Sequence, residues 1–377
     1  MSERLTVSQG EFELERLPKR PREVLRAWDA ADEYLLDASA TLGANAARVL
    51  ILNDSFGALA VALNAYKPYA VSDSYVSQQA TRLNLTANNL PEHSATLLNS
   101  LEPLTGLFDC VLIKVPKTLA LLEHQLICLR PHLTPTTQII VAGMIKNLPP
   151  SVWKLLESLI GPTTTSLAKK KARLIFATLD ADLMIPSNPY PVSYQLENTE
   201  YLISNHANVF SRDSLDIGTR FFLQHLPARQ DACDIVDLGC GNGLVGLIAA
   251  ERSPAATMHF IDESFMAVAS AKDNFQRAFS GQREATFAVG DGLMAVESAS
   301  AELILCNPPF HQQHTVGDQI AVSLFKQSRR VLRKGGELWV IGNRHLAYAN
   351  DLNRLFGAHS VIAANSKFII VKAVLAG

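Results

Sequence analysis

Short apolar segments of strand length alternate with helical patterns in the second half of the chain. The helical patterns run from Leu244 to Glu251 and from Ser264 to Phe275. The apolar segments are Asp234 to Leu238, Met258 to Ile261, Ala285 to Val289, Leu303 to Cys306, Glu337 to Ile341 and Phe368 to Val371. Such alternation is typical of a mostly parallel sheet with helices on both faces. The sequence therefore predicts an α/β, Rossmann-like fold for this half.

The first half repeats the same order of elements. An apolar run ending at Leu52 and followed by Phe56-Gly57 corresponds to the run ending at Leu238 and followed by Asn242-Gly243. Later correspondences pair Val71-Ser72-Asp73-Ser74 with Phe260-Ile261-Asp262-Glu263, Phe108 to Pro116 with the segment ending at Pro309, and Ile140 to Gly143 with Val340 to Gly342. An internal repeat of this length favours an ancient duplication. We therefore expect two tandem Rossmann-like domains.

A stretch rich in proline, from Pro186 to Pro191, separates the two halves. Prolines at this density interrupt periodic structure and are typical of linkers. We place the first domain at residues 1–185, the linker at 186–195 and the second domain at 196–377. Two short strand patterns, Val192 to Leu196 and Tyr201 to Ser204, flank a polar turn and predict a hairpin near the start of the second domain.

Composition limits the partners of the chain. Its 377 residues exceed one ordinary core, and 48% hydrophobic with 19% charged residues fits a folded globular protein. No apolar run reaches the length of a membrane span and the N-terminus lacks a secretory pattern, so we expect a cytoplasmic protein. The five cysteines are scattered without zinc-ligand or disulfide spacing. With a net charge of -2, any nucleic-acid binding depends on local basic patches. We expect a monomer without a metal.

A glycine-rich loop runs from Asp237 to Gly243, between a strand and a helix. Glycines at 239, 241 and 243 let the backbone turn tightly and approach a ligand, although such glycines also serve plain packing. Asp262, at the end of the next strand, is placed to accept hydrogen bonds from ribose hydroxyls. Asp291, after the third strand, is placed to accept one from an adenine amino group. Alternatively, Asp262 is a helix N-cap and Asp291 a turn residue. Their order at strand ends favours a nucleoside site.

The tetrad Asn307-Pro308-Pro309-Phe310 closes the fourth strand, at the edge where doubly wound sheets bind ligands. The Asn307 side-chain oxygen and the Pro308 carbonyl can accept the two N–H bonds of an amino group conjugated to a ring or carbonyl. The prolines remove competing donors, and Phe310 offers a flat face for stacking. In the alternative interpretation, these residues form a turn, a strand terminator and a core contact. The tetrad predicts methylation of an exocyclic amino nitrogen.

The filled Asp-x-Gly-x-Gly-x-Gly loop resembles that of the class I methyltransferases. The resemblance implies S-adenosylmethionine as cofactor, with Asp237 near its methionine moiety and Asp262 on its ribose. Upstream, the Phe210-Ser211-Arg212 segment and the Asp216 to Thr219 segment, taken with the tetrad, resemble the bacterial ribosomal RNA guanine-N2 methyltransferases. This similarity spans nearly the whole chain and implies that Phe210 to Thr219 covers the cofactor.

Within that group the chain is most similar to enzymes that form N2-methylguanine in 23S ribosomal RNA. The implied substrate is naked RNA or an early assembly intermediate. The alternatives are a 16S enzyme with the same two-domain plan, a protein glutamine methyltransferase that shares the tetrad, and an RNA-binding factor without catalytic activity. Whether Arg212, His206 and His311 take part in function stays open.

The first half has lost the residues expected to bind the cofactor. Asn53-Asp54-Ser55 stands where the second half has Gly239-Cys240-Gly241, and Lys114-Val115 stands where it has Asn307-Pro308. We expect this degenerate domain to keep the fold without the reaction. Its lysines favour RNA phosphate binding, although exposed lysines are usually only solvated. The candidates are Lys114 and Lys117 near the former acceptor site, and Lys169, Lys170, Lys171 and Arg173 farther along.

Overall fold

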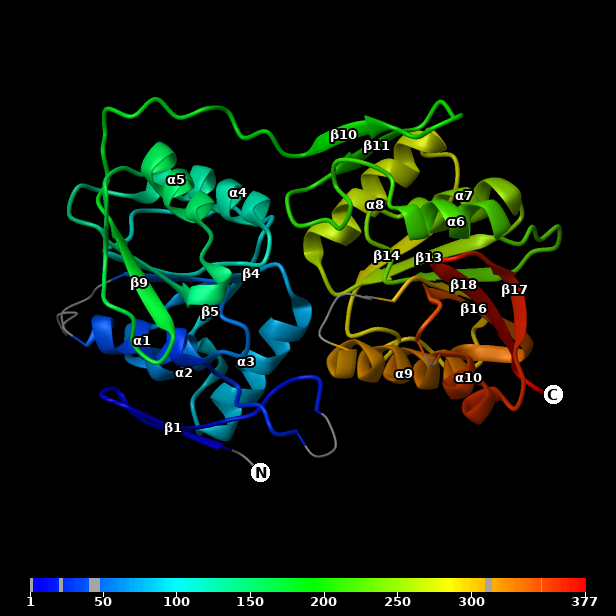
Figure 1. Cartoon of the computed structure of the whole chain (residues 1–377), viewed down its shortest axis with the longest axis horizontal. Helices are drawn as coiled ribbons and strands as arrows, with labels where there is room; N and C mark the ends of the chain where they lie inside the picture. The colour runs from blue at the N-terminus through cyan, green and yellow to red at the C-terminus, as the bar shows by residue number, and fades with distance from the viewer. Residues whose placement is uncertain (1–2, 20–22, 41–47, 309–313, 347) are drawn as a thin grey trace. The chain divides into compact units, whose positions relative to one another are not determined.

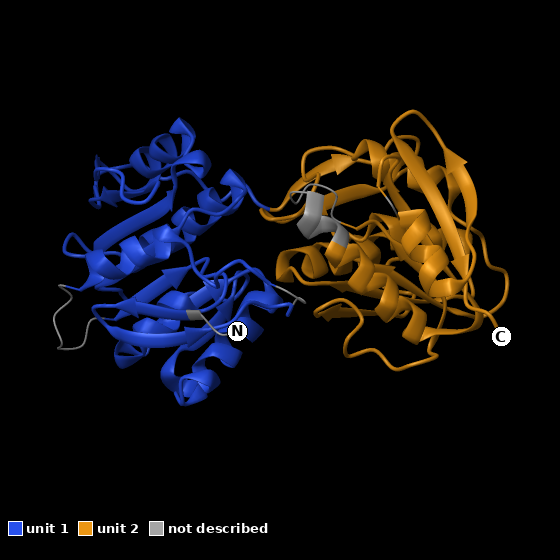
Figure 2. Ribbon diagram, turned by 60° about the horizontal axis from the view of Figure 1, so that its bottom comes forward, with its two compact units in different colours: residues 1–190 blue, residues 191–377 orange. Residues whose placement is uncertain are grey.

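The computed structural model describes the chain except for residues 1–2, 20–22, 41–47, 309–313 and 347. It divides into two compact units, Met1–Tyr190 and Pro191–Gly377 (Figure 2). The division falls inside the segment for which we predicted a linker. The end of the first unit is held to that unit, because the Tyr190 hydroxyl donates to Glu123 Oε2 at 2.6 Å and Asn188 Nδ2 lies 2.9 Å from His124 Nδ1.

The second unit is built on a seven-stranded sheet of order β14-β13-β12-β15-β16-β18-β17. Neighbouring strands from β14 to β16 are parallel, whereas β18 is antiparallel to both β16 and β17. The strands are β12 (Asp234–Leu238), β13 (Thr257–Asp262), β14 (Ala285–Val289), β15 (Ala301–Cys306), β16 (Leu332–Asn343), β17 (Ser360–Ala364) and β18 (Phe368–Val374). A hairpin of β10 (Val192–Gln195) and β11 (Leu202–Asn205) comes before them, as predicted.

Helices cover both faces of this sheet (Figure 1). Ile235 of β12 belongs to the core on the side of α6 (Ile217–His225), α7 (Leu244–Arg252) and α8 (Phe265–Ala278). Val236 belongs to the core on the side of α9 (His314–Val331) and α10 (Tyr348–Phe356). Burial on both faces explains the continuous apolar runs of the central strands. The predicted strands are present, but β17 was missed because it is a short edge strand whose Val361 is 53% exposed.

The first unit has the same architecture, with a sheet of order β5-β4-β3-β6-β7-β9-β8. The strands are β3 (Val49–Leu52), β4 (Tyr69–Ser72), β5 (Thr96–Asn99), β6 (Cys110–Lys114), β7 (Gln138–Met144), β8 (Thr163–Thr165) and β9 (Ala172–Ala177). One core of this unit contains the hairpin of β1 (Glu3–Val7) and β2 (Gly10–Leu14) together with α1 (Ala30–Ser39), α2 (Ala58–Ala62) and α3 (Tyr75–Ala87). The other core contains α4 (Leu119–Leu129) and α5 (Pro150–Leu159). The predicted pair of tandem Rossmann-like domains is confirmed.

Strand registers give the residue correspondence between the units. Leu52 pairs with Val71, and Leu238 pairs with Ile261. Val71 therefore corresponds to Ile261, and Ser72 occupies the place of Asp262. Our sequence pairing of Val71 with Phe260 was wrong by one residue. Asp73, which follows Ser72, matches Asp262 in residue type, but strand pairing decides the correspondence.

A buried asparagine joins the hairpin to the loop in both units, which extends the repeat beyond the sheet. Asn84 Nδ2 donates to the carbonyls of Glu15 and Phe56, and its Oδ1 accepts from Glu15 N at 2.8 Å. Asn274 makes the same three bonds, two with the Ser204 backbone and one with the carbonyl of Asn242 in the glycine-rich loop. The sequence comparison missed this pair because a lone asparagine inside a helical pattern carries no local signal.

Candidate functional site

The glycine-rich loop leaves β12 through three left-handed residues, with φ of 72° at Gly239, 54° at Gly241 and 77° at Gly243. Glycine adopts this conformation at little cost. A side chain at Gly243 would come within 2.7 Å of Ala271 Cβ, so this glycine is needed for close helix packing. At Gly241, by contrast, no atom of the described residues other than Gly241 and its two chain neighbours lies within 4 Å of the position of a Cβ. The loop therefore borders open space at Gly241, where a ligand can approach its backbone.

Asp262 holds the loop from the end of β13. Its Oδ2 accepts from Gly241 N at 2.9 Å, and its Oδ1 accepts from Ser264 N at 3.0 Å. Ser264, rather than Asp262, is the N-cap of α8. Burial raises the pKa of the Asp262 carboxyl. A carboxylate offers about four lone-pair sites, so Asp262 keeps capacity to accept bonds from a ligand.

Asp237 lies deeper in the unit and is only 2% exposed. Its Oδ2 accepts from Gly246 N at 2.7 Å, which satisfies an N–H of the first turn of α7. Burial, together with the nearby charge of Asp262, raises the pKa of Asp237 to about 8. The site therefore holds an acid whose ionised form gains from a nearby positive charge.

Asp291 follows β14, in the turn after the third strand. It is half-buried, and burial raises the pKa of its carboxyl. The preceding Gly290 N donates to the carbonyl of Asp262 at 2.9 Å, so the two turns are joined. The strands β12, β13 and β14 are parallel neighbours. The three predicted acids thus lie at the same carboxyl edge of the sheet.

Asn307 follows β15 at this edge. Its Nδ2 donates to Thr219 Oγ1 at 3.0 Å, whereas its Oδ1 is buried and accepts no hydrogen bond from the residues that the structure describes. Its backbone carbonyl lies 4.0 Å from the position of a Cβ at Gly239, so the tetrad begins beside the glycine-rich loop. Pro308 is buried. Pro309, Phe310 and His311 lie outside the described residues.

The segment upstream of α6 contributes to the Asn307 side of the site. Asp216 is the N-cap of α6 and accepts from Thr219 N at 2.8 Å. Phe210 is 57% exposed. Arg212 donates to the Ala207 carbonyl at 3.0 Å and pairs with its neighbour Asp213, so the guanidinium supports the segment itself.

Sequence reasoning named Asp216 and Asn242 within motifs but assigned neither of them a structural role. Asp216 caps α6, and its Asp-x-x-Thr spacing to Thr219 was an available helix-start signal. Asn242 Nδ2 donates to Asn205 Oδ1 at 2.9 Å and so ties the loop to β11.

No group of three or more histidine, cysteine, aspartate or glutamate side chains among the described residues is arranged to hold a metal. None of the described helices is long and apolar enough to cross a membrane.

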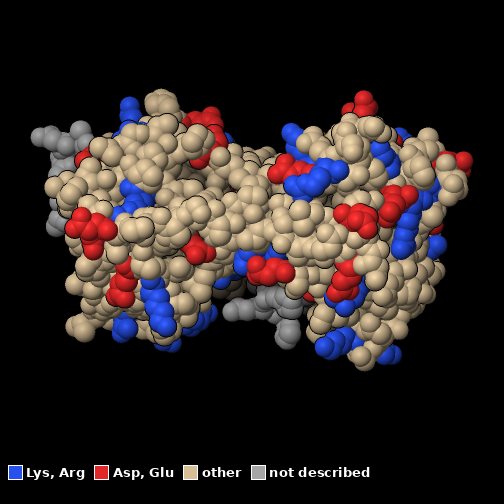
Figure 3. Space-filling model, turned by 90° about the horizontal axis from the view of Figure 1, so that it is seen from above, with Lys and Arg blue, Asp and Glu red and all other residues tan. Residues whose placement is uncertain are grey.

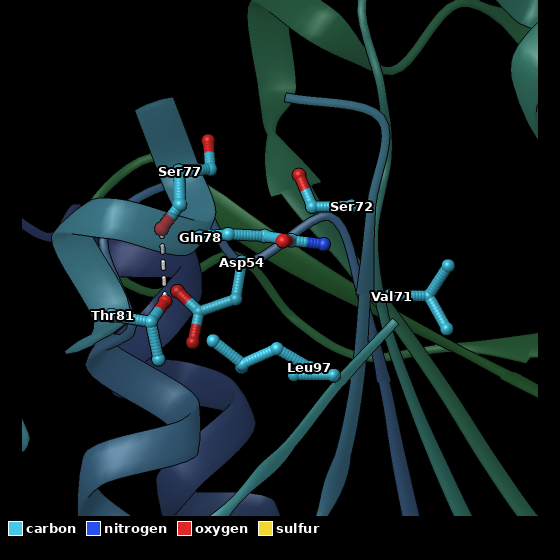
Figure 4. Close-up of a pocket in the computed structure, with 8 residues that line it drawn as sticks. Asp54, Val71, Ser72, Ser77, Gln78, Thr81 and Leu97 are labelled. Carbon is cyan, nitrogen blue, oxygen red and sulfur yellow. Dashed lines mark hydrogen bonds between the residues drawn. The ribbon is translucent and has the colours of Figure 1, made fainter. Parts of the chain in front are cut away.

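In the first unit the corresponding loop is occupied by its own side chain. Asp54, at the place of Cys240, accepts backbone N–H bonds from four successive residues at the start of α2, namely Gly57, Ala58, Leu59 and Ala60. Figure 4 shows this carboxylate on the side of Thr81, among the residues that line a small pocket. The remaining cavity measures about 10 Å³, which is about one water. A nucleoside does not fit there.

Lys114, at the place of Asn307, lies in an internal ion pair. Its Nζ is 2.7 Å from Asp32 Oδ2 and 3.5 Å from Asp29 Oδ1. Burial raises the pKa of Asp32 to about 6, and Lys114 opposes that rise. The predicted role of Lys114 in phosphate binding does not fit this placement, because its charge is already neutralised inside the unit.

The second basic cluster is partly neutralised as well. Lys169 pairs with Asp37, and Lys170 Nζ lies 2.6 Å from Glu33 Oε2. Lys171 and Lys117 are exposed, and Arg173 is half-buried. Basic and acidic side chains are interspersed on the face of the molecule drawn in Figure 3. Lys117 and Lys171 are therefore the stronger remaining candidates for RNA phosphate contacts.

Comparison with known proteins agrees with this two-unit organisation. Residues 2–181 match the family model "RLMG N-terminal domain", and residues 200–372 match "Methyltransferase small domain". A protein of Stutzerimonas stutzeri named ribosomal RNA large subunit methyltransferase G is 49% identical over 99% of both chains. A Streptomyces griseus protein of the same name is 45% identical over 98% of this chain and 99% of its own.

Among solved structures, the Thermus thermophilus 16S rRNA N2 G1207 methyltransferase in complex with AdoMet and guanosine covers 100% of this chain and 98% of its own. The TM-score is 0.79 and the sequence identity is 20%. At this identity the likeness shows the shared two-domain fold. It does not distinguish one substrate from another.

Proposed function

Because the chain belongs to the ribosomal RNA large subunit methyltransferase G family, we propose that it methylates the exocyclic N2 of a guanine in 23S ribosomal RNA. S-adenosylmethionine is the methyl donor, and the products are N2-methylguanine and S-adenosylhomocysteine. The substrate is naked RNA or an early assembly intermediate. The first unit contacts RNA while the second receives an extruded guanine.

The observation that carries this proposal is the buried Asn307 Oδ1, which accepts no bond from the described residues. A buried acceptor without a partner costs free energy of about 1–3 kcal/mol, which a substrate donor recovers. The lone pair of a guanine amino group is delocalised into the ring. An acceptor for one of its N–H bonds orients the nitrogen, and the Pro308 carbonyl is the second acceptor in this proposal. The displaced proton leaves to water.

The residues of the second unit fit S-adenosylmethionine. Its ribose hydroxyls and adenine amino group are donors, which suits Asp262 and Asp291, and its positively charged methionine end suits the buried Asp237. The open space at Gly241 admits the ligand to the loop backbone. The bound cofactor supplies an electrophilic methyl group; the chain's own residues hold it and orient the amino group.

The test is radiolabelled methyl transfer from S-adenosylmethionine to naked 23S RNA, naked 16S RNA and assembled large subunits, followed by nucleoside analysis. We expect N2-methylguanine in 23S RNA and a loss of about 100-fold or more in kcat for Asn307→Ala. Asn350→Ala, at an exposed position of α10, is the matched control and should leave the rate unchanged. Full activity of Asn307→Ala would refute the mechanism, and incorporation into 16S RNA alone would favour the small-subunit alternative.

A further inference from the structure

We propose that Asp216 and Thr219 are positioning residues that fix the amide orientation of Asn307. This inference rests on the proposed function, because it concerns how Asn307 presents its oxygen to the substrate amino group. It assigns to Thr219 a contact with Asn307, the residue that in this proposal binds the amino group to be methylated. The resemblance to known methyltransferases implied only that its segment covers the cofactor.

Hydrogen-bond direction along this chain of side chains is fixed by chemistry. The Asp216 carboxylate only accepts, so the Thr219 hydroxyl donates its single proton to Asp216 Oδ2 at 3.2 Å. The hydroxyl oxygen is then left as an acceptor for Asn307 Nδ2 at 3.0 Å. Asn307 must therefore turn its nitrogen towards Thr219 and its oxygen away. The two orientations of a free amide are nearly equal in shape, so only such partners select one.

The helix start holds the Thr219 hydroxyl in place. One carboxylate oxygen, Asp216 Oδ2, accepts both the backbone N–H and the side-chain O–H of Thr219. A side chain at Gly218 would approach the same oxygen to 3.0 Å, so the glycine leaves room for this arrangement. The hydroxyl position is thereby tied to the first turn of α6, and a rigid support is what orientation of a reacting group requires.

The first unit preserves the same three positions with different chemistry. Its α1 begins at the N-cap Asp29, and the third helical residue, Asp32, contacts Lys114. In the second unit α6 begins at the N-cap Asp216, and its third helical residue, Thr219, contacts Asn307. The contact between helix start and strand end is thus part of the repeated fold. Of these two helix-to-strand contacts, the one between a hydroxyl and an amide belongs to the unit whose loop borders open space at Gly241, and this links the pairing to the reaction.

The experiment compares Thr219→Val, which removes the hydroxyl with little change of shape, with Thr219→Ser, which keeps it. Each full-length variant is assayed for kcat, for KM with 23S RNA, for the Kd of S-adenosylmethionine and for thermal stability. We expect Thr219→Val to lose about 10- to 100-fold in kcat while the cofactor Kd changes less than about threefold. Thr219→Ser should stay within about threefold of the parent. Asp216→Asn, which keeps the helix N-cap but loses the acceptor-only carboxylate, should lower kcat in the same way.

A double variant separates positioning from an independent role. If Thr219 acts through Asn307, then Asn307→Ala with Thr219→Val is no slower than Asn307→Ala alone. Multiplying losses, or a weaker cofactor Kd with unchanged kcat, would overturn the inference and make Thr219 a cofactor contact. A loss of thermal stability without rescue by Thr219→Ser would also overturn it. Failure of the proposed function is recognised separately, by full activity of Asn307→Ala.

Discussion

Cofactor affinity should depend on pH through the buried Asp237. Its pKa of about 8 reflects burial and the nearby Asp262 charge, so the carboxyl is mostly protonated at pH 7 without a ligand. S-adenosylmethionine brings a positive charge that favours the ionised form. Binding should therefore release a proton, and affinity should rise with pH until Asp237 is ionised in the free protein.

The size of the effect follows from the pKa. With a value of about 8, about 1% of the molecules carry an ionised Asp237 at pH 6 and about 50% at pH 8. If only the ionised form binds, the cofactor Kd falls by about 50-fold over this range. The stability of the apo protein should change with pH in the opposite sense. Because the folded pKa lies above the ordinary value of 3.8, the folded state binds the proton more tightly, and stability falls as pH rises from about 4 to about 8.

Isothermal titration calorimetry between pH 6 and pH 9, in buffers of different ionisation enthalpy, measures both the Kd and the protons released. Asp237→Asn provides the control: its Kd should vary less with pH, and its apo stability should fall less between pH 4 and pH 8. A wild-type Kd that is constant from pH 6 to pH 8, with no proton release, would refute the reasoning. Asp237 would then serve only as the acceptor for Gly246 N.

Three further predictions concern the frame around the site and the first unit. Asn274→Ala leaves a buried N–H and two carbonyls without their partner, so chemical denaturation should show a loss of about 2 kcal/mol or more. Lys114→Met leaves Asp32 buried and unpaired, and by the same measurement it should cost about 3–5 kcal/mol of stability. The double variant Lys114→Met with Asp32→Leu should recover much of that stability. Equal losses in the single and double variants would contradict this account. Replacing Lys117 and Lys171 by alanine should weaken RNA binding in gel-shift titrations. The slope of log affinity against log salt concentration should become less steep by up to about 1.4, at about 0.7 for each phosphate contact. An unchanged slope would show that neither lysine contacts the RNA.

The strands and the glycine-rich loop were predictable because their signals are local. Both faces of β12 are buried, so Ile235 to Leu238 form an apolar run that only Asp237 interrupts. Left-handed backbone at Gly239, Gly241 and Gly243 favours glycine, which makes the loop visible as a spacing of residue types. The repeat was visible for the same reasons, since both halves use the same signals in the same order.

Contacts between distant segments were not predictable in this way. Thr219 and Asn307 are 88 residues apart, and the sequence gives no sign that they meet. The ion pair of Lys114 was not predictable, because a lysine at a strand end looks the same in the sequence whether it faces solvent or a buried aspartate. Its partner Asp32 lies on a helix 82 residues earlier. Only the register of the strands and the start of the helix bring such groups together.

We expect the first unit, unlike the second, to bind no cofactor, and the reason can be tested. In the second unit the buried acid, Asp237, lies on the strand and the loop beside it borders open space; in the first unit Ile51 stands on the strand and Asp54 lies in the loop. The Asp54 oxygens satisfy four N–H groups at the start of α2, where a ligand's acceptor atoms would otherwise bind.

Removing that carboxylate should destabilise the unit rather than restore a binding site. Asp54→Ala leaves four helix N–H groups without a partner, and loss of such a cap costs about 1–2 kcal/mol or more. The Lys114 and Asp32 pair stays in place of the amide acceptor, and Ser72 stands where a ribose carboxylate is needed. Calorimetry should therefore give one S-adenosylmethionine per chain for both the parent and Asp54→Ala. A second binding event in the variant would show that the Asp54 side chain alone closes the site, and that the residues Lys114, Asp32 and Ser72 do not prevent cofactor binding.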